Sequence, residues 1–316
     1  MEEKSKVSNR NYGIDLLRVV CMLFILILHS LGHGGVLKNT VSGAYQYKYV
    51  WFLEIIAYVA VDIFALISGY VSYSDKEKKY NFSNYINIWL EVVFYNIIIC
   101  FIYNYINPEL VTRKDFIMSL LPVTNKLYWY LTAYTGLFLL MPVINKAIRN
   151  TSELSLKKLL LVLIIGFSFF DRITNVFGQS NGYSVIWIVI LYIIGAIIKK
   201  CHIGENLKWY HIIPTILGLY IISLLYKLFG FSGDILKVKI TKDLLINYTS
   251  PTILGASILY LIGFSKLKLN NFMIKLTKFM APAAFSVYVI NDQKFVWSQI
   301  MQNRFANIIS LHPLAI

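Results

Sequence analysis

The sequence predicts an all-α fold, a polytopic transmembrane helical bundle of about nine or ten helices. Hydrophobic residues make up 57% of the 316 residues, and only 15% are charged. The mean hydropathy is +0.61, a value that is unusual for soluble proteins. Apolar runs recur along the whole chain, so a single bundle is a better prediction than two soluble domains.

Nine apolar runs are long enough, or nearly long enough, to cross a bilayer as helices. They occupy residues 14–32, 51–73, 85–106, 128–148, 158–170, 184–198, 210–229, 251–264 and 281–300. The fifth and eighth runs are short, and the ninth is polar for a lipid-exposed helix. Residues 305–316 resemble the start of another apolar segment. We therefore expect one transmembrane domain, residues 1–316, whose last helix is missing or truncated.

The Lys and Arg residues lie in short clusters between the apolar runs. More of them fall on the side that holds the N-terminus, which predicts a multi-pass membrane protein with a cytoplasmic N-terminus. The net charge of +14 favours anionic membrane lipids as partners, and not nucleic acid, because the basic residues form no continuous stripe. The first run lacks a small-residue cleavage site, so it is expected to be a retained helix and not a signal peptide.

The first run contains a permanent cation and a titratable ring, Arg18 and His29. Eleven helical steps of 100° place both side chains on one face, roughly 16 Å apart. Asp15 lies one turn before Arg18 on the same face. Because ionisable groups are costly in lipid, we expect Arg18 and His29 to face a protein interior or a wet cavity.

His29 is the strongest catalytic candidate, because a neutral imidazole can take a proton from a hydroxyl and return one to a leaving group. The alternative is a buried histidine that is hydrogen-bonded to a neighbouring helix. Arg18 is expected either to bind a phosphate of an anionic donor or to pair with Asp15. His33 and His29 have the spacing of a metal pair, but no nearby carboxylate completes a site, so no metal is expected.

Asp62 places a carboxylate in the second apolar run and is a further catalytic candidate, which could accept a hydrogen bond from a substrate or a histidine. The neighbouring Ser68 and Gly69 are explained by close helix packing. Lys78 and Lys79 follow this run. Their first interpretation is that they mark the cytoplasmic side of the membrane. The second is that they bind a phosphate group of the donor.

Two other segments combine polar or aromatic residues with apolar ones. Residues 128–134 read YWYLTAY; an aromatic belt explains most of this segment, and a sugar-stacking platform is the alternative. Asn291 and Asp292 interrupt the ninth run, which predicts either a cavity lining or a local end to the helix.

With these segments in order, the chain resembles the integral-membrane acyltransferase 3 family, and in particular bacterial members that acylate cell-surface polysaccharides. The resemblance covers nearly the whole chain. The matching segments are the Arg18–His29 pair, residues 64–70 (FALISGY), 128–134 (YWYLTAY) with Met141-Pro142, 182–184 (GYS), 191–195 (LYIIG), 250–252 (SPT) and 287–290 (VYVI).

The resemblance implies ten transmembrane helices and a reaction that moves an acyl group, commonly acetyl, from cytoplasmic acyl-CoA to a carbohydrate hydroxyl. The histidine matching His29 would be catalytic, and the arginine matching Arg18 would support donor binding or the active-site fold. The chain departs from the pattern in two places. These relatives usually read Ile-His-Asp where this chain has Ile290, Asn291 and Asp292, and the tenth helix is absent or truncated.

The leading hypothesis is therefore an acetyl-CoA-dependent membrane O-acyltransferase that acts on a cell-surface or lipid-linked polysaccharide. Its catalytic residues would be His29, Arg18 and Asp62, and its donor-binding residues would be Arg18, Lys78 and Lys79. One alternative is a transporter or exporter of a sugar or amino acid, because proton-coupled carriers also use intramembrane His and Asp. The other is a catalytically inactive family member, because Asn291 cannot serve as a base.

Overall fold

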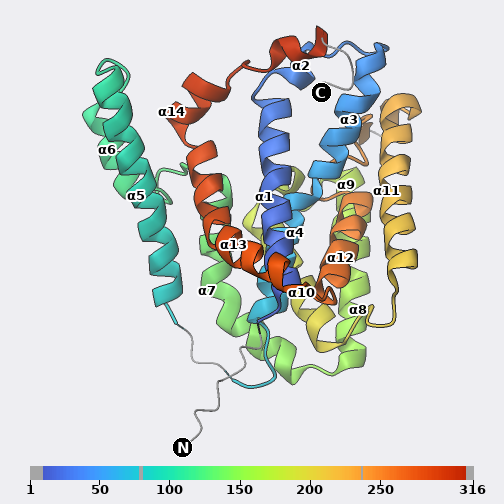
Figure 1. Ribbon diagram of the computed structural model, residues 1–316. Coiled ribbons are helices and arrows are strands. Elements are labelled where there is room, and N and C mark those ends of the chain that lie inside the picture. Colours follow the sequence, from blue (N-terminus) through green and yellow to red (C-terminus); the bar gives the residue numbers. More distant parts are fainter. Residues whose placement is uncertain (1–9, 78–80, 236–237, 311–316) are drawn as a thin grey trace, which may run out of the picture.

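The computed structural model describes residues 10–77, 81–235 and 238–310. It is 74% helical, which confirms the all-α prediction. Figure 1 shows the long helices running side by side as a bundle, with α1 (Tyr12–Gly32) in its middle and α13 (Asn271–Asn291) beside it. The strands among the described residues are β1 (Gly233–Ile235) and β2 (Val238–Ile240), which pair antiparallel with Gly233 opposite Ile240.

Among the described residues, six helical segments are long and apolar enough to cross a membrane. Besides α1 and α13, they are the consecutive α3 (Tyr45–Ala57) and α4 (Val59–Ser72), then α5 (Ser83–Ile106), α7 (Trp129–Asn150) and α11 (Trp209–Phe229). Shorter helices in the bundle are α8 (Glu153–Leu163) with its π-helical continuation Ile164–Phe170, α10 (Val185–Lys200) and α12 (Pro251–Ser265). The remaining short elements are α2 (Val36–Asn39), α6 (Arg113–Leu120), α9 (Asp171–Thr174) and α14 (Lys294–Val296), with single turns at Ser180–Gly182, Trp297–Met301 and Ala306–Ser310.

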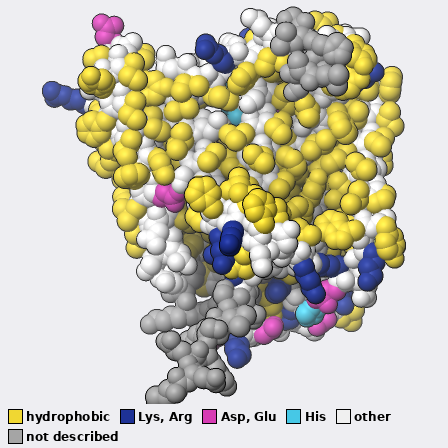
Figure 2. Space-filling view, viewed as in Figure 1, with side chains coloured by type: hydrophobic (Ala, Val, Ile, Leu, Met, Phe, Trp, Pro, Cys, Tyr) yellow, Lys and Arg dark blue, Asp and Glu magenta, His cyan; other side chains and the backbone are white. Residues whose placement is uncertain are grey.

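The outer faces of these helices carry large apolar side chains. Exposed examples lie on α5, α7 and α11, and include Phe94, Phe101, Leu139, Val143 and Ile221. Figure 2 shows hydrophobic side chains covering most of one face, with most of the Lys and Arg side chains toward its upper and lower ends. A continuous apolar surface of this kind is unfavourable in water and is stabilised by contact with lipid. The fold is therefore that of a membrane protein.

The centre of the bundle is the contact between α4 and α10, which is the most extensive helix pair. A Cβ atom at Gly69 would lie 1.9 Å from the carbonyl oxygen of Tyr192, and one at Gly195 would lie 2.1 Å from that of Leu66. The two backbones touch because neither glycine has a side chain, as is common between membrane helices. The packing interpretation of Gly69 is thus confirmed.

Replacing Gly69 with alanine is expected to destabilise the fold by about 1–3 kcal/mol, because the new methyl group can be accommodated only if α4 and α10 move apart. The measurement is the thermal unfolding of the purified protein. Gly218→Ala is the matched control, since a Cβ there would meet nothing within 4 Å. Equal shifts in the two variants would contradict the prediction.

Two predicted boundaries were wrong. The second span begins earlier than predicted: it covers Tyr45–Ser72, with α3 and α4 separated only at Tyr58. The ninth segment is helical from Asn271, where the Asn270 side chain caps the first turn by accepting from the Met273 amide, and it ends at Asn291. The polar pair Asn291 and Asp292 therefore marks a local helix end. The predicted truncated last helix falls partly on residues 311–316, outside the described residues.

Candidate active site

A cavity of about 410 Å³ opens within the bundle, between α1, α3, α4, α7 and α13. Its volume is in the range of pockets that bind small molecules, and such pockets are mostly apolar with a few polar groups. The lining is mainly aliphatic and aromatic. The ionisable side chains other than tyrosine are His29, His33, Glu54 and Asp292.

His29 lies in the last turn of α1, on the cavity wall. Its Nδ1 forms a hydrogen bond with Oδ1 of Asn291, at the end of α13. An amide oxygen can only accept, so Nδ1 carries the proton and Nε2 keeps its lone pair. His29 therefore faces a protein cavity, as predicted, and holds an unprotonated ring nitrogen. Asn291 cannot act as a base, but it orients the ring and fixes the tautomer.

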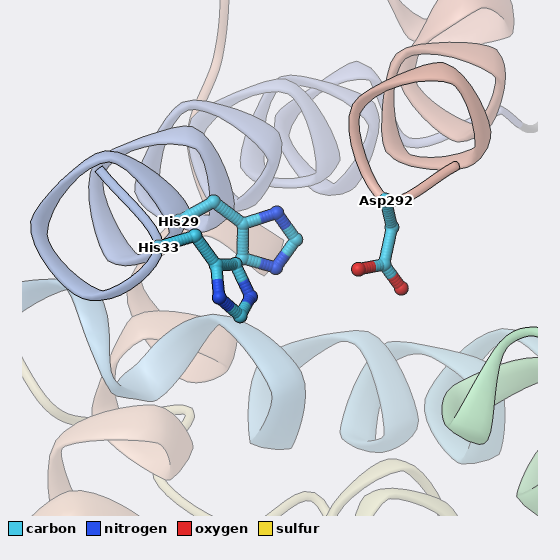
Figure 3. A group of neighbouring side chains, drawn as sticks. All are labelled: His29, His33 and Asp292. Carbon is cyan, nitrogen blue, oxygen red and sulfur yellow. The ribbon is translucent and has the colours of Figure 1, made fainter. Parts of the chain in front are cut away.

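His33 and Asp292 complete a cluster around His29 (Figure 3). The two imidazole rings project side by side from the end of α1, with centroids 5.2 Å apart, and the Asp292 carboxylate faces them from the end of α13. One nitrogen from each ring and a carboxylate oxygen all lie within 4.8 Å of one another.

We predicted that no carboxylate lies close enough to His29 and His33 to complete a metal site, and this prediction was wrong. Asp292 is remote in sequence, but α13 packs along α1 and brings it to the two rings. Two histidines and one carboxylate are a ligand set that suits Zn²⁺ or another divalent transition metal. These three residues could hold such an ion, and they could equally transfer protons without one.

Burial changes the proton affinity of the two groups beside His29. It raises the pKa of Asp292 to about 6, although the neighbouring His33 opposes this shift. Burial also lowers the pKa of His33, and His29 adds to that effect whereas Asp292 opposes it. Burial therefore favours the neutral form of both groups, and it brings the pKa of Asp292 closer to the range that general acid–base chemistry needs.

Asp292→Asn is expected to move the acid limb of a pH–activity profile to lower pH. The carboxylate raises the pKa of His33, so its removal makes that imidazole harder to protonate. A positive charge on His33 opposes proton uptake by the neighbouring His29, so activity should then fall only at lower pH. The measurement is kcat/KM against pH, which reports the groups of the free protein. An acid limb at the same pH in the variant and the wild type would contradict this assignment.

Arg18 lies on the same helix as His29 but does not line the cavity. Its Nη1 is 2.5 Å from Oδ1 of Asp15, and Nε of Arg10 is 2.5 Å from the other carboxylate oxygen. The pairing with Asp15 is confirmed. Because eleven helical residues span roughly 16 Å, the guanidinium and the imidazole are at different depths of the bundle.

Asp62, a further predicted site residue, does not line the cavity with His29. Asp62 is fully buried, and its Oδ1 accepts a hydrogen bond from Nε1 of Trp187 at 3.0 Å. It joins α4 to α10, whereas Val61 and Phe64 of the same helix line the cavity. Lys78 and Lys79 lie outside the described residues.

The aromatic segment at the start of α7 has two roles. The Tyr128 hydroxyl donates to Oδ1 of Asn96 and to the carbonyl of Val289, each at 3.1 Å, and so ties α7 to α5 and α13. Trp129 and Tyr130 line the cavity. These two rings therefore do not form an aromatic belt that faces lipid.

The sequence analysis missed Glu54. This residue is on α3, is only 7% exposed and lines the cavity. Its position in the second apolar run is the same signal that singled out Asp62, so it could have been found. Tyr183 and Tyr248, which precede α10 and α12, also line the cavity and gave no such signal because they lie in connecting segments.

Comparison with known proteins gives one match. A family model described as an acyltransferase domain matches residues 11–315, essentially the whole chain. No curated protein and no solved structure matches the sequence.

Proposed function

The chain belongs to this acyltransferase family, and we propose that it is an O-acetyltransferase of the plasma membrane. In this proposal it moves an acetyl group from acetyl-CoA to a hydroxyl of a cell-surface or lipid-linked polysaccharide. The observation that carries the proposal is the unprotonated Nε2 of His29 on a cavity wall, held in place by Asn291.

The reaction then follows from the chemistry of this ring. Nε2 takes the proton of the acceptor hydroxyl while its oxygen attacks the thioester carbonyl, so that a C–O bond forms and the C–S bond breaks. The imidazolium returns the proton to the departing thiolate, which leaves as coenzyme A. The Asp292 carboxylate across the cavity would stabilise the transient positive charge on the rings.

The shape of the bundle supports different routes for the two substrates. The cavity lies near the end of α1 that is remote from Tyr12, which is the outer half if the N-terminus is cytoplasmic. A surface glycan would arrive there and lie against Trp129 and Tyr130. Arg18 is nearer the other end, where it would bind the phosphates of the cytoplasmic donor. Lys78 and Lys79, which follow the second apolar run in the sequence, would contribute further positive charge to the donor.

The test is incubation of the purified full chain in lipid nanodiscs with acetyl-labelled acetyl-CoA and polysaccharide extracted from the cell envelope. We expect label in the polysaccharide, and we expect mild alkali to release it, since esters are labile and amides are not. Absence of transfer by a folded protein would overturn the proposal. Alkali-stable label would exclude O-acetylation, and saccharide uptake into liposomes without acetyl-CoA would favour a transporter.

A further inference from the structure

Glu54 has a buried carboxylate oxygen without a partner. The side chain lines the cavity, is 93% buried, and its Oε2 accepts no hydrogen bond from any described residue. Leaving a buried polar atom unpaired is unfavourable, and the cost is larger inside an apolar bundle. Because the side chain that carries this oxygen lines the cavity, a ligand that enters the cavity can supply the missing hydrogen-bond donor.

The surroundings of Glu54 are aromatic. Tyr58, one turn later in the chain, contacts Tyr248 with ring centroids 4.9 Å apart, and Tyr248 contacts Tyr183 at 5.2 Å. Trp129 closes the group, 4.6 Å from Tyr183 and nearly parallel to Tyr248. These four rings all line the cavity, so a ligand at Glu54 meets aromatic faces together with one carboxyl group.

The charges near Glu54 favour a neutral ligand. Lys227 forms an ion pair with Asp243 at 2.5 Å and lies 3.5 Å from the centroid of the Trp51 ring. Arg172 donates to the carbonyl oxygens of Asp243 and Leu244, at 2.8 and 2.9 Å. Lys227 and Arg172 balance Glu54 and Asp243, and the other carboxyl group of the cavity, Asp292, lies beside His29 and His33. The part of the cavity around Glu54 therefore has no surplus negative charge to attract an ammonium group.

We propose that Glu54 binds a hydroxyl of the acceptor saccharide and thereby selects which hydroxyl reaches His29. A sugar ring has apolar C–H faces, which suit the tyrosine and tryptophan rings, and hydroxyl groups around its edge, which suit the carboxyl. Because Glu54 and His29 line the same cavity, a saccharide held at Glu54 presents a defined part of its edge to Nε2. This inference rests on the proposed function, and it makes Glu54 a determinant of acceptor specificity.

The first test is kinetic and compares three variants of the full chain. Glu54→Leu removes the hydrogen bond and should raise the KM for envelope polysaccharide by about tenfold or more, with the KM for acetyl-CoA unchanged. Glu54→Gln keeps a hydrogen-bonding group and should stay within about threefold of the wild type. The control is Glu91→Gln, since Glu91 lies in a membrane-spanning helix but bonds Ser286 away from the cavity lining.

The second test measures binding without any reaction, by equilibrium dialysis of tritium-labelled envelope oligosaccharides. We expect the wild type to bind most tightly and Glu54→Gln to bind almost as tightly. Glu54→Leu should bind at least tenfold more weakly than the wild type. If Glu54→Leu does not fold, Glu54→Met takes its place.

The outcomes separate this inference from the proposed function. Normal transfer with unchanged saccharide KM in Glu54→Leu overturns the inference and leaves the acetyltransferase intact. Saccharide binding that depends on Glu54, without transfer from acetyl-CoA, supports the site and rejects the reaction. Equal losses in Glu54→Gln and Glu54→Leu overturn the assignment of a neutral hydroxyl, because a cationic ligand would need the carboxylate charge.

Discussion

Replacing His29 with alanine is expected to slow acetyl transfer by about 10²–10⁴-fold, the range that one general acid–base group supplies. The variant loses the only group on the described cavity wall that combines a free ring nitrogen with an orienting hydrogen bond from α13. The measurement is the initial rate of label transfer from acetyl-CoA to envelope polysaccharide at saturating donor.

His202→Ala is the matched control for this experiment. The His202 ring is largely exposed and pairs with Glu205, a surface interaction worth little to stability. We expect its transfer rate to equal that of the wild type. A His29→Ala protein that folds normally and keeps the full rate would remove the imidazole from the mechanism.

The parts of the fold that were predicted correctly depend on local properties of the sequence. The length of an apolar run and its composition are sufficient to recognise a membrane helix, and a histidine within such a run is conspicuous. Helix boundaries were less accurate, because they depend on single side chains such as the cap at Asn270.

The site itself could be predicted only in part, because it is assembled from distant segments. No sequence pattern states that α13 packs along α1, and that contact is what brings Asn291 and Asp292 to His29. Asn291 was interpreted as a departure from the family pattern, whereas in the structure it is the partner that sets the tautomer of the ring. Asp62 satisfied the same sequence criterion as His29 but bonds Trp187 in the core.

Arg18→Gln is expected to raise the KM for acetyl-CoA by roughly 10- to 150-fold, because a hydrogen bond to a charged group contributes about 1.5–3 kcal/mol. The side chain is 32% exposed, so one face of the guanidinium is open to a ligand while Nη1 holds Asp15. Arg18→Lys should be intermediate, since an ammonium keeps the charge but loses the planar fork. The measurement is the dependence of the transfer rate on acetyl-CoA concentration, with kcat and KM determined separately.

The variant Asp15→Asn shows whether Arg18 binds the donor or has a purely structural role. If Arg18 serves only the cluster with Arg10 and Asp15, then Asp15→Asn and Arg18→Gln should lower the melting temperature similarly and leave the KM for acetyl-CoA unchanged. If Arg18 binds the donor phosphates, only its own replacement should raise that KM. The difference matters for the mechanism, because Arg18 and His29 are separated by about 16 Å of helical rise along α1. A donor with its phosphates at Arg18 must extend its thioester arm along the helix to reach the cavity, and shortened thioesters that lack the nucleotide should then be insensitive to Arg18→Gln.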